Sequence, residues 1–587
     1  MKVSDYVIDS LAAQGVTHIF EICGGAISHL LDSLYGRTDI TTVSMHHEMA
    51  AAIAAEGYAR AGGNIGVAMA TSGPGATNLI TGIGSCYFDS VPCLFITGQV
   101  NTYEYKFKKP VRQIGFQETD IVSIVRPIVK ESHLVDDEKA IRRVLEGSFD
   151  CARTGRPGPV LIDIPLNIQR AAVDVDGLEP FVKKGMGAGK RIPAATLKKI
   201  HAQIRSSERP VILAGGGVRA SGACADLARF ARATGIPVVS SLMGLDAFPH
   251  DDSLFSGMIG TYGNRYANLA VANADFILAL GTRFDTRQTG TRPETFARGA
   301  KIVHVDIDSR ELGNKIHAWI PVQSDIRQFL EAMNRHGGMN DPLPDFSGWR
   351  RRIGGYREKY PDYTRPDKPA IDPNSFFHTL SGQLPADSIV CVDVGQIQMW
   401  AAQSLAITET QRFLTEGGMA SIGSALPMAI GASFAQPGKP IVAIAGDGGF
   451  QLNIQELQTL YHHQCPVKVI VLNNGGYGMI RQFQEQYLNC RFQSSGIGYS
   501  NPDFQAVVSA YKIHARKITR NEEIPAALQH LFSDMKPGFL EVVLDEDARV
   551  RPKLAVNRPV EDQEPLLDRK ELRENMIVAM LPEPDTP

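Results

Sequence analysis

The chain has 587 residues, a length that predicts about four domains at roughly 150 residues each, and two or three are also compatible with it. Hydrophobic residues make up 43% and charged residues 21%, which excludes a disordered, fibrous or membrane-spanning chain. The net charge of −3 indicates no nucleic-acid or membrane partner, and eight cysteines without a C-x-x-C pair predict a reduced, cytoplasmic protein.

The N-terminal segment alternates between helical patterns and short apolar runs. We expect a first helix that Ser4 caps and Gly15 ends. Apolar runs follow at residues 17–20, 66–70, 93–97 and 160–164, with glycine-rich loops and helical patterns between them. Continuous apolar strands that alternate with helices predict a parallel sheet covered on both faces.

The same pattern occurs twice more along the chain. A polar linker at about 173–195 leads to a unit that starts near 210, and a charged, proline-rich stretch at 341–372 leads to strands at 388–394, 441–445 and 467–472. We predict an α/β fold of three doubly wound parallel-sheet domains, at residues 1–175, 190–340 and 370–550, and a C-terminal tail at 551–587. The glycine-rich run that ends at Lys190 lacks the spacing of a phosphate-binding loop, so we expect no nucleotide site there.

The third unit carries polar residues at the ends of two apolar strands. The run Gly446-Asp447-Gly448 is followed 25 residues later by Asn473-Asn474. Doubly wound sheets bind ligands at the carboxyl ends of their strands, and Mg²⁺ takes carboxylate, amide and carbonyl oxygens. Asp447, Asn474 and the carbonyl of Gly476 are therefore a candidate metal site. The alternative is two ordinary turns, because Gly, Asp and Asn are turn residues.

Glu48 precedes a run of small residues that predicts a close-packed helix. A buried carboxyl has a raised pKa and can donate a hydrogen bond to a ring nitrogen. The alternative is a helix-terminal carboxylate that the helix dipole stabilises. A zinc site is excluded, because Ala51 stands where H-E-x-x-H needs a second His.

Several motifs in order along the chain resemble the thiamine diphosphate-dependent enzymes, and among these the acetohydroxyacid synthase (acetolactate synthase) branch. The general motifs are Glu48, Thr71-Ser-Gly-Pro-Gly-Ala-Thr-Asn78, Gly446-Asp-Gly448 and Asn473-Asn474. The branch motifs are Phe116-Gln-Glu118, Gly155-Arg-Pro-Gly-Pro159, Leu242-Met-Gly-Leu245, Phe284-Asp-Thr-Arg287-Gln-Thr-Gly290 and Asp393-Val-Gly-Gln396. The resemblance spans about residues 1–545 and implies a pyrimidine-binding, a central flavin-binding-like and a diphosphate-binding domain.

The resemblance implies a cofactor site in two parts. Glu48 matches the glutamate that bonds N1′ of the cofactor's pyrimidine, and Gly25 matches a backbone position beside the reactive C2 atom. Ile422 matches the apolar side chain that holds the cofactor bent, and Asp447, Asn474 and Gly476 match the Mg²⁺ ligands. The other positions that match cofactor contacts are Asn78, Val394, Gly395, Gln396, Gly418, Gly446, Gly448, Gly449 and Met479.

The middle domain resembles the flavin-binding domain of acetohydroxyacid synthases. This implies bound FAD, although joining two keto acids needs no redox step. The alternative is a domain that binds nothing. The matching positions are Arg156, Gly215, Gly217, Arg283, Asp285 and Asp306.

The resemblance implies that pyruvate is decarboxylated and that its two-carbon unit joins a second carbonyl compound to give 2-acetolactate. Phe116 and Gln117 match residues that line the substrate pocket. Arg287 matches the arginine that pairs with the carboxylate of the acceptor, and the alternative for it is a structural ion pair.

The acceptor side departs from the family pattern. Phe483 stands where Trp is usual, Leu166 where Lys is usual, and Tyr262 where His is often found. An alternative acceptor is therefore a keto-sugar nucleotide, which the basic and aromatic stretch 101–110 could serve; a pyruvate oxidase or a simple decarboxylase is less favoured.

The resemblance also implies a homodimer or homotetramer, because family members build the site from the first domain of one subunit and the third domain of another. A small regulatory subunit is compatible with the sequence, although no docking element can be recognised. A non-catalytic homologue is disfavoured, because Glu48, Asp447 and Asn474 are all present.

Overall fold

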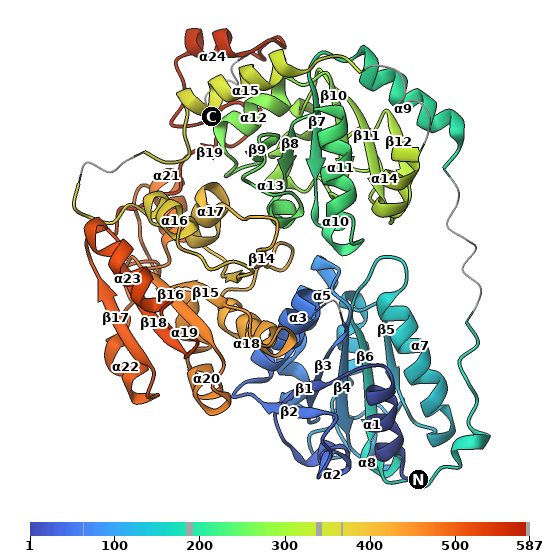
Figure 1. The fold of residues 1–587 in the computed structure, drawn as a ribbon. Coiled ribbons are helices and arrows are strands. Elements are labelled where there is room, and N and C mark those ends of the chain that lie inside the picture. The colour runs from blue at the N-terminus through green and yellow to red at the C-terminus, as the bar shows by residue number, and fades with distance from the viewer. Residues whose placement is uncertain (63, 184–191, 336–342, 365–367, 583–587) are drawn as a thin grey trace.

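The computed structural model describes residues 1–62, 64–183, 192–335, 343–364 and 368–582, and these contain three six-stranded sheets in which all strands are parallel (Figure 1). The glycine-rich run that ends at Lys190 lies outside the described residues. The predicted α/β fold with three doubly wound domains is confirmed.

The first sheet has the strand order β2-β1-β3-β4-β6-β5. Its strands are β1 (His18–Glu21), β2 (Thr41–Ser44), β3 (Gly66–Ala70), β4 (Cys93–Gln99), β5 (Glu131–Leu134) and β6 (Val160–Pro165). The helices around it are α1 (Val3–Ala13), α2 (Ser28–Leu34), α3 (Glu48–Gly62), α4 (Pro74–Asn78), α5 (Ile80–Asp89), α6 (Ile121–Val125), α7 (Ile141–Arg153) and α8 (Leu166–Gln169). β1 and β3 lie side by side at the point where the strand order reverses, so the loops that follow them meet there.

The start of α1 differs from the prediction. Lys2 is the N-cap residue, and the carboxylate of Asp5 accepts its backbone N–H at 3.2 Å. Ser4 lies inside the first turn, fully buried, and its hydroxyl accepts a hydrogen bond from Ser33 at 2.9 Å. Gly15 follows the helix with φ +79°, as expected for a residue that ends a helix.

The central sheet has the strand order β12-β11-β10-β7-β8-β9. Its strands are β7 (Pro210–Ala214), β8 (Val238–Ser240), β9 (Phe255–Met258), β10 (Phe276–Leu280), β11 (Lys301–Asp306) and β12 (Ile320–Gln323). Its helices are α9 (Ala194–Ser206), α10 (Gly216–Ala220), α11 (Cys224–Thr234), α12 (Arg265–Asn273), α13 (Thr286–Thr289) and α14 (Ile326–Arg335), and α15 (Ser347–Lys359) follows. This order places the first strand, β7, beside the fourth, β10, which is the arrangement of dinucleotide-binding folds.

The third sheet has the order β14-β13-β15-β16-β18-β17, which repeats the order of the first sheet strand for strand. Its strands are β13 (Ile389–Val392), β14 (Arg412–Thr415), β15 (Ile441–Gly446), β16 (Val467–Asn473), β17 (His514–Ile518) and β18 (Gly538–Val543). Its helices are α16 (Pro373–Ser381), α17 (Gln396–Ser404), α18 (Ala425–Ala435), α19 (Asp447–Leu452), α20 (Leu457–His463), α21 (Gly478–Tyr487), α22 (Phe504–Ala510) and α23 (Ile524–Leu531). β13 and β15 are the pair at which the order reverses.

The first and third domains pack against each other through two helices rich in small residues, α3 and α18 (Figure 1). Ala50 to Ala55 of α3 are all buried. A side chain at Gly57 would overlap the carbonyl of Met428, and one at Gly431 would overlap the carbonyl of Ala54. The close approach of the two helices therefore requires glycine at both positions.

The tail packs on the central domain. It contains the antiparallel strands β19 (Lys553–Leu554) and β20 (Gln563–Glu564) and the helix α24 (Arg569–Asn575). Arg265 of α12 donates to the carbonyl of Pro565 at 2.7 Å, and Gln563 donates to that of Gly263 at 2.7 Å. In the part of the chain that is described, no helix has both the length and the apolar character that a bilayer crossing requires.

Candidate active site

Three oxygen atoms converge at the carboxyl ends of β15 and β16. Oδ1 of Asn474 lies 3.0 Å from the carbonyl oxygen of Gly476 and 3.3 Å from Oδ1 of Asp447. The amide nitrogen of Asn474 points the other way and donates to Oε1 of Gln396 at 2.9 Å. With the opposite amide orientation, the nitrogen of Asn474 would donate to both of these oxygens. A carboxylate, an amide oxygen and a carbonyl are ligands that suit Mg²⁺. The predicted metal ligands are therefore brought together.

The carboxylate of Asp447 is buried among neutral hydrogen-bond donors. Oδ2 accepts from the hydroxyl of Tyr499 at 2.8 Å, from the backbone N–H of Gly476 at 3.1 Å and from the amide of Asn501 at 3.3 Å. Burial raises the pKa of Asp447 to about 6. Tyr499 and Asn501 were not predicted, because they belong to a loop without a recognisable motif, and only the structure shows that they hold Asp447.

A second carboxylate lies at the end of the neighbouring strand β13. Asp393 accepts the backbone N–H of Val394 at 2.8 Å and that of Gly423 at 2.9 and 3.0 Å, and burial raises its pKa to about 7. It thereby fixes the start of the segment with Gly395 and Gln396 and the end of the loop with Ile422. Gly395 has φ +143°, where a residue with a side chain is strained.

The glycines after Asp447 have a packing role. A Cβ atom at Gly448 would lie 2.5 Å from the ring of Tyr477, and one at Gly449 would overlap the carboxylate of Asp393. At Gly446 the nearest atom would be 3.9 Å away. The close packing of α19 against its neighbours explains Gly448 and Gly449 without reference to a ligand.

Glu48 begins α3, and Asn78 ends α4. The side-chain amide of Asn78 donates to Oε2 of Glu48 at 2.9 Å. A Cβ atom at Gly75 would lie 2.8 Å from Cγ2 of Thr71 and 3.4 Å from Oε1 of Glu48, so close packing against Thr71 requires glycine here. A Cβ atom at Gly25 would have no neighbour within 4 Å, so this position faces open space.

Phe116 and Gln117 lie in a loop that a buried carboxylate organises. Glu118 accepts the backbone N–H groups of Lys106 at 2.8 Å and Ile114 at 2.7 Å. The side chain of Phe116 is 86% exposed, and Gln117 has φ +64°. The loop therefore presents a large apolar side chain to solvent although it is anchored.

The two halves of the candidate site are separate within one chain. Glu48 bonds a residue of the first domain, and Asp447 bonds residues of the third domain. Across the described residues, no hydrogen bond or ion pair joins the two carboxylates or their partners.

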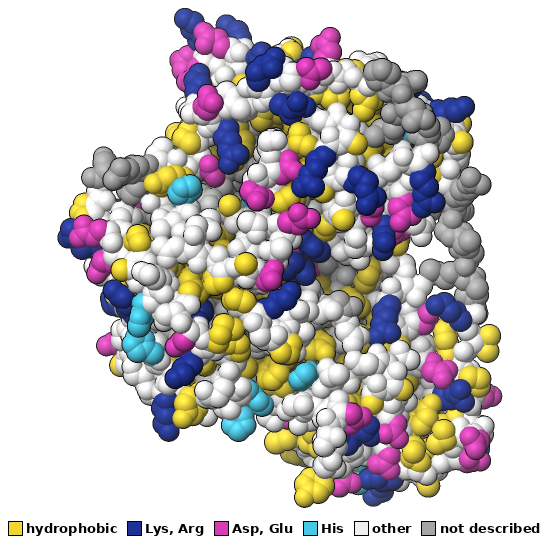
Figure 2. Space-filling view, viewed as in Figure 1, with side chains coloured by type: hydrophobic (Ala, Val, Ile, Leu, Met, Phe, Trp, Pro, Cys, Tyr) yellow, Lys and Arg dark blue, Asp and Glu magenta, His cyan; other side chains and the backbone are white. Residues whose placement is uncertain are grey.

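A cavity of about 760 Å³ lies where the central domain meets the other two. Five of the six predicted flavin-binding residues line it, together with Arg287 and Tyr262. The five are Arg156, Gly217, Arg283, Asp285 and Asp306. Figure 2 shows Lys and Arg side chains mixed with Asp and Glu across this part of the surface.

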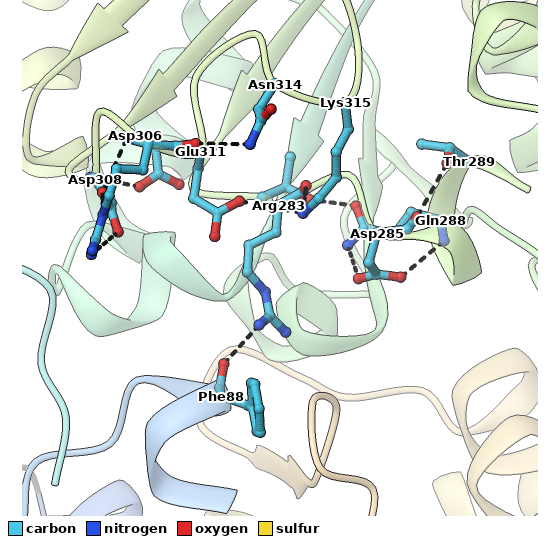
Figure 3. A network of polar contacts seen from close by, with 12 residues as sticks. Phe88, Arg283, Asp285, Gln288, Thr289, Asp306, Asp308, Glu311, Asn314 and Lys315 are labelled. Carbon is cyan, nitrogen blue, oxygen red and sulfur yellow. Dashed lines mark hydrogen bonds and ion pairs between the residues drawn. The ribbon is translucent and has the colours of Figure 1, made fainter. Parts of the chain in front are cut away.

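Ion pairs and hydrogen bonds hold the polar wall of the cavity (Figure 3). Arg156 pairs with Glu311 at 2.9 Å, and Arg283 donates to the carbonyl of Phe88 at 2.8 Å, so both arginines join the first domain to the central one. Asp285 caps α13 by accepting the N–H of Arg287 at 2.9 Å. Burial raises the pKa of Asp306 to about 6.

The glycines of the central domain allow two loops to touch. Side chains at Gly215 and Gly217 would overlap or crowd the backbone of Gly281, and the N–H of Gly217 donates to the carbonyl of Gly281 at 3.0 Å. These loops follow β7 and β10, the two strands at which the order of the sheet reverses.

The predicted acceptor residues come from different parts of the chain. Tyr262 donates its hydroxyl hydrogen to Sδ of Met479 at 3.1 Å, which joins the central domain to α21. Arg287 is exposed, and within the described part of the chain it forms no side-chain hydrogen bond or ion pair. Phe483 is 50% exposed, and Leu166 begins α8 in the first domain.

Comparison with known proteins gives matches along most of the chain. Models of the thiamine pyrophosphate enzyme domains match in order: the N-terminal TPP binding domain at residues 1–124, the central domain at 197–333 and the C-terminal TPP binding domain at 393–542. Acetolactate synthase 2 of Nicotiana tabacum is 39% identical over 571 residues, which cover 94% of this chain and 83% of that protein. The acetolactate synthase isozyme 2 large subunit of Escherichia coli is 37% identical over 553 residues, which cover 94% and 97%.

Proposed function

The chain belongs to the acetolactate synthase family of thiamine pyrophosphate enzymes, and from this we propose that it decarboxylates pyruvate and joins the remaining two-carbon unit to a second carbonyl compound. The observation that carries the proposal is the convergence of the Asp447, Asn474 and Gly476 oxygens. A cation held by these oxygens would suit a diphosphate, and they lie in the part of the third domain that matches a TPP-binding domain.

We assign this site to Mg²⁺ and the neighbouring loops to the diphosphate of the cofactor. The candidate contacts are the segment of Gly395 and Gln396 and the loop of Ile422, which meet at the carboxyl end of β13. When bound, thiamine diphosphate supplies a nucleophilic carbon that adds to the keto group and accepts the electron pair released with carbon dioxide.

Glu48 is proposed to bond the pyrimidine ring of the cofactor. Asn78 holds one carboxylate oxygen, and the other accepts no hydrogen bond within the described chain. The free oxygen can therefore exchange a proton with a ring nitrogen, which is the role that activates the cofactor.

A second copy of the chain is proposed to complete each site. Glu48 and the metal ligands share no partner in one chain, and the surface near the loops of the site carries exposed large apolar side chains, which a partner would cover. These are Phe107, Val111, Ile114, Phe116, Met419, Leu452, Ile480, Phe483 and Ile497. A small regulatory subunit is a further candidate partner, since the Escherichia coli relative is a large subunit.

The cavity of the central domain is proposed to hold FAD. It opens at the crevice between β7 and β10, where sheets of this strand order bind dinucleotides, and its volume of about 760 Å³ suits a ligand of that size. Arg156 and Arg283 supply cationic groups toward a diphosphate. A yellow preparation that releases one FAD per chain on denaturation is expected, and a colourless active enzyme would contradict this assignment.

The acceptor carboxylate is proposed to bind Arg287. Its guanidinium is exposed on the cavity side of α13 and has no ion-pair partner among the described residues, so it is available for a bidentate contact. With pyruvate as acceptor, the product is 2-acetolactate.

One observation favours a second acceptor class, a keto-sugar nucleotide. Lys108, Lys109 and Arg112 are exposed in the loop that leads to Phe116, and none of them pairs with an acid in the described chain. Three free cations beside the substrate loop suit a phosphorylated acceptor.

The deciding experiment incubates the purified protein with Mg²⁺, thiamine diphosphate and pyruvate, and follows pyruvate loss and products. Formation of 2-acetolactate is expected. Acetaldehyde or acetate as the main product would contradict the proposal. Pyruvate consumption that begins only after a nucleotide-linked keto sugar is added would favour the second acceptor.

A further inference from the structure

Two residues at the end of α5, Phe88 and Asp89, bond the other two domains, and the next residue, Ser90, holds an arginine that pairs with the central domain. The carbonyl of Phe88 accepts from Arg283 of the central domain at 2.8 Å (Figure 3). The carboxylate of Asp89 bonds the third domain. The hydroxyl of Ser90, which has φ +62°, accepts from Arg156 at 2.8 Å, and Arg156 pairs in turn with Glu311 of the central domain. The end of α5 is therefore a junction of all three domains.

Each carboxylate oxygen of Asp89 accepts one backbone N–H group from the third domain. Oδ2 accepts the backbone N–H of Gly417 at 2.9 Å, and Oδ1 accepts that of Gly418 at 2.8 Å. A side chain at Gly418 would overlap Cβ of Phe88, so this loop lies directly on α5. Hydrogen bonds from backbone N–H groups to a carboxylate are the strong, charge-assisted kind.

The loop that Asp89 holds is the loop that carries Ile422. Its far end is fixed by Asp393, which accepts the N–H of Gly423 at 2.9 Å. Between the two ends, Ala420 has φ +58°, a conformation that residues with side chains rarely adopt. Asp89 and Asp393, from two domains, thus hold the two ends of residues 417–423, and Glu416 accepts the N–H of Ser421 between them at 2.7 Å.

The same residues form part of the wall of the 760 Å³ cavity. Phe88, Asp89 and Gly417 line it together with Met243 of the central domain. A Cβ atom at Gly417 would lie 2.5 Å from Sδ of Met243, so the loop is in close contact with the central domain. A ligand in the cavity therefore rests against the residues that fix the loop.

We propose that Asp89 is a positioning residue that couples filling of the central cavity to the shape of the thiamine diphosphate site through the loop 417–423. This inference rests on the proposed function, in which the cavity holds FAD and the loop contacts thiamine diphosphate. A ligand that orders the Asp89 junction also orders the loop, so the two cofactors bind more tightly together than separately. The coupling is reciprocal, because linkage requires equal effects in both directions.

The test measures binding and needs no turnover. Isothermal titration gives the Kd of thiamine diphosphate, in the presence of Mg²⁺, for the flavin-free and the FAD-saturated full-length protein. In the wild type, FAD is expected to lower this Kd by about fivefold or more. In Asp89→Asn and Asp89→Ala the factor is expected to fall below about twofold, because the two N–H groups bond different oxygens of Asp89, of which Asn keeps one and Ala none.

Asp503→Asn is the matched control. Asp503 also accepts two backbone N–H groups, here both at Oδ1, from Gln505 at 3.0 Å and Ala506 at 3.2 Å, and all three residues lie in the third domain. This variant is expected to keep the wild-type factor. Gly418→Ala, which pushes the loop away from α5 while Asp89 remains, is expected to lose it.

The outcomes separate this inference from the proposed function. If both cofactors bind the wild type and FAD leaves the Kd unchanged, or if Asp89→Asn keeps the wild-type factor, the inference is wrong and the proposed function stands. If the wild type binds no thiamine diphosphate, the proposed function fails as well. If the wild type binds thiamine diphosphate but not FAD, both the flavin assignment and the inference are wrong.

Discussion

Asn78 donates a hydrogen bond to Oε2 of Glu48 at 2.9 Å, and no residue of the described chain donates to Oε1. The contact orients the carboxyl group at the start of α3 and leaves the other oxygen free of hydrogen bonds from the described residues. A carboxyl group that is held at one oxygen and free at the other suits proton exchange with a bound ring nitrogen.

Glu48→Gln is expected to lower kcat at least about 100-fold while the Kd of thiamine diphosphate changes little, because the amide keeps the volume of the side chain but cannot move a proton. Pyruvate consumption and isothermal titration measure the two quantities. Glu179→Gln, an exposed position in the linker after the first domain, is the control and should match the wild type. A Glu48→Gln enzyme with more than half of the wild-type kcat would rule out this role.

Asp447→Asn is expected to raise the Mg²⁺ concentration needed for cofactor binding by about tenfold or more, because it removes the only carboxylate of the three converging oxygens. Titration of Mg²⁺ at a fixed concentration of thiamine diphosphate measures this. Asp545→Asn, exposed in the same domain, is the control. An unchanged Mg²⁺ requirement would contradict the assignment of the ligands.

Tyr262→Phe removes the hydroxyl group that fills the space next to Met479. We expect the variant to accept larger 2-keto acids more readily. The ratio of product formed with 2-ketobutyrate as acceptor to product formed with pyruvate should rise by up to about tenfold, because removing a single atom from a pocket changes substrate preference only modestly. Competition between the two acceptors measures the ratio. Tyr35→Phe is the control, because Tyr35 is 91% exposed. A Tyr262→Phe ratio equal to that of the wild type would show that this contact does not limit the acceptor.

The buried carboxyl of Asp163 predicts a pH effect on stability. It lies on β6 and accepts from Thr97 at 2.7 Å and from Gln99 at 2.9 Å on β4. Burial, assisted by the nearby charge of Asp120, raises its pKa from 3.8 to about 7. Between about pH 4 and pH 7 the folded state therefore keeps this proton, whereas the unfolded state has lost it. The stabilisation that comes from binding the proton is full below about pH 4 and is lost as the pH rises to about 7.

Asp163→Asn replaces the titrating group with a neutral one of the same size. The melting temperature of the variant relative to the wild type is expected to rise from pH 4 to pH 7 and then to stay level. Differential scanning calorimetry at pH 5, 6, 7 and 8 measures this. Asp136→Asn, an exposed position in the same domain, should show no such trend. A constant difference between Asp163→Asn and the wild type would mean that Asp163 is ionised in the fold throughout.

The fold was predictable from the sequence where strands are buried on both faces. β3 and β7 read as continuous apolar runs, and the structure places them in the interior of their sheets. The edge strands β2, β5, β14 and β17 were not predicted, because one side of an edge strand faces polar surroundings and its sequence has no continuous apolar run. The interior strand β18 (Gly538–Val543) was also not predicted, and Glu541 interrupts its apolar run.

The candidate site was predictable only in part. Asp447 and Asn474 follow buried strands, and this local pattern is sufficient to place them together. The partners that hold them come from distant loops, as Tyr499 does, and the junction at Asp89 depends on three domains meeting at the end of one helix. Such contacts depend on tertiary packing, which no local sequence pattern encodes.

Mixing two variants, at a Mg²⁺ concentration too low for Asp447→Asn to bind the cofactor, tests whether each site is built from two chains. In a hybrid dimer of Glu48→Gln and Asp447→Asn chains, a shared site combines the intact Glu48 of one chain with the intact Asp447 of the other. Random mixing makes half of the dimers hybrids with one intact site of two, so activity should return to about a quarter of the wild-type value. If each site lies within one chain, every site in the mixture lacks one residue. No return of activity after subunit exchange, verified by mass spectrometry of the mixed dimers, would therefore contradict the shared site.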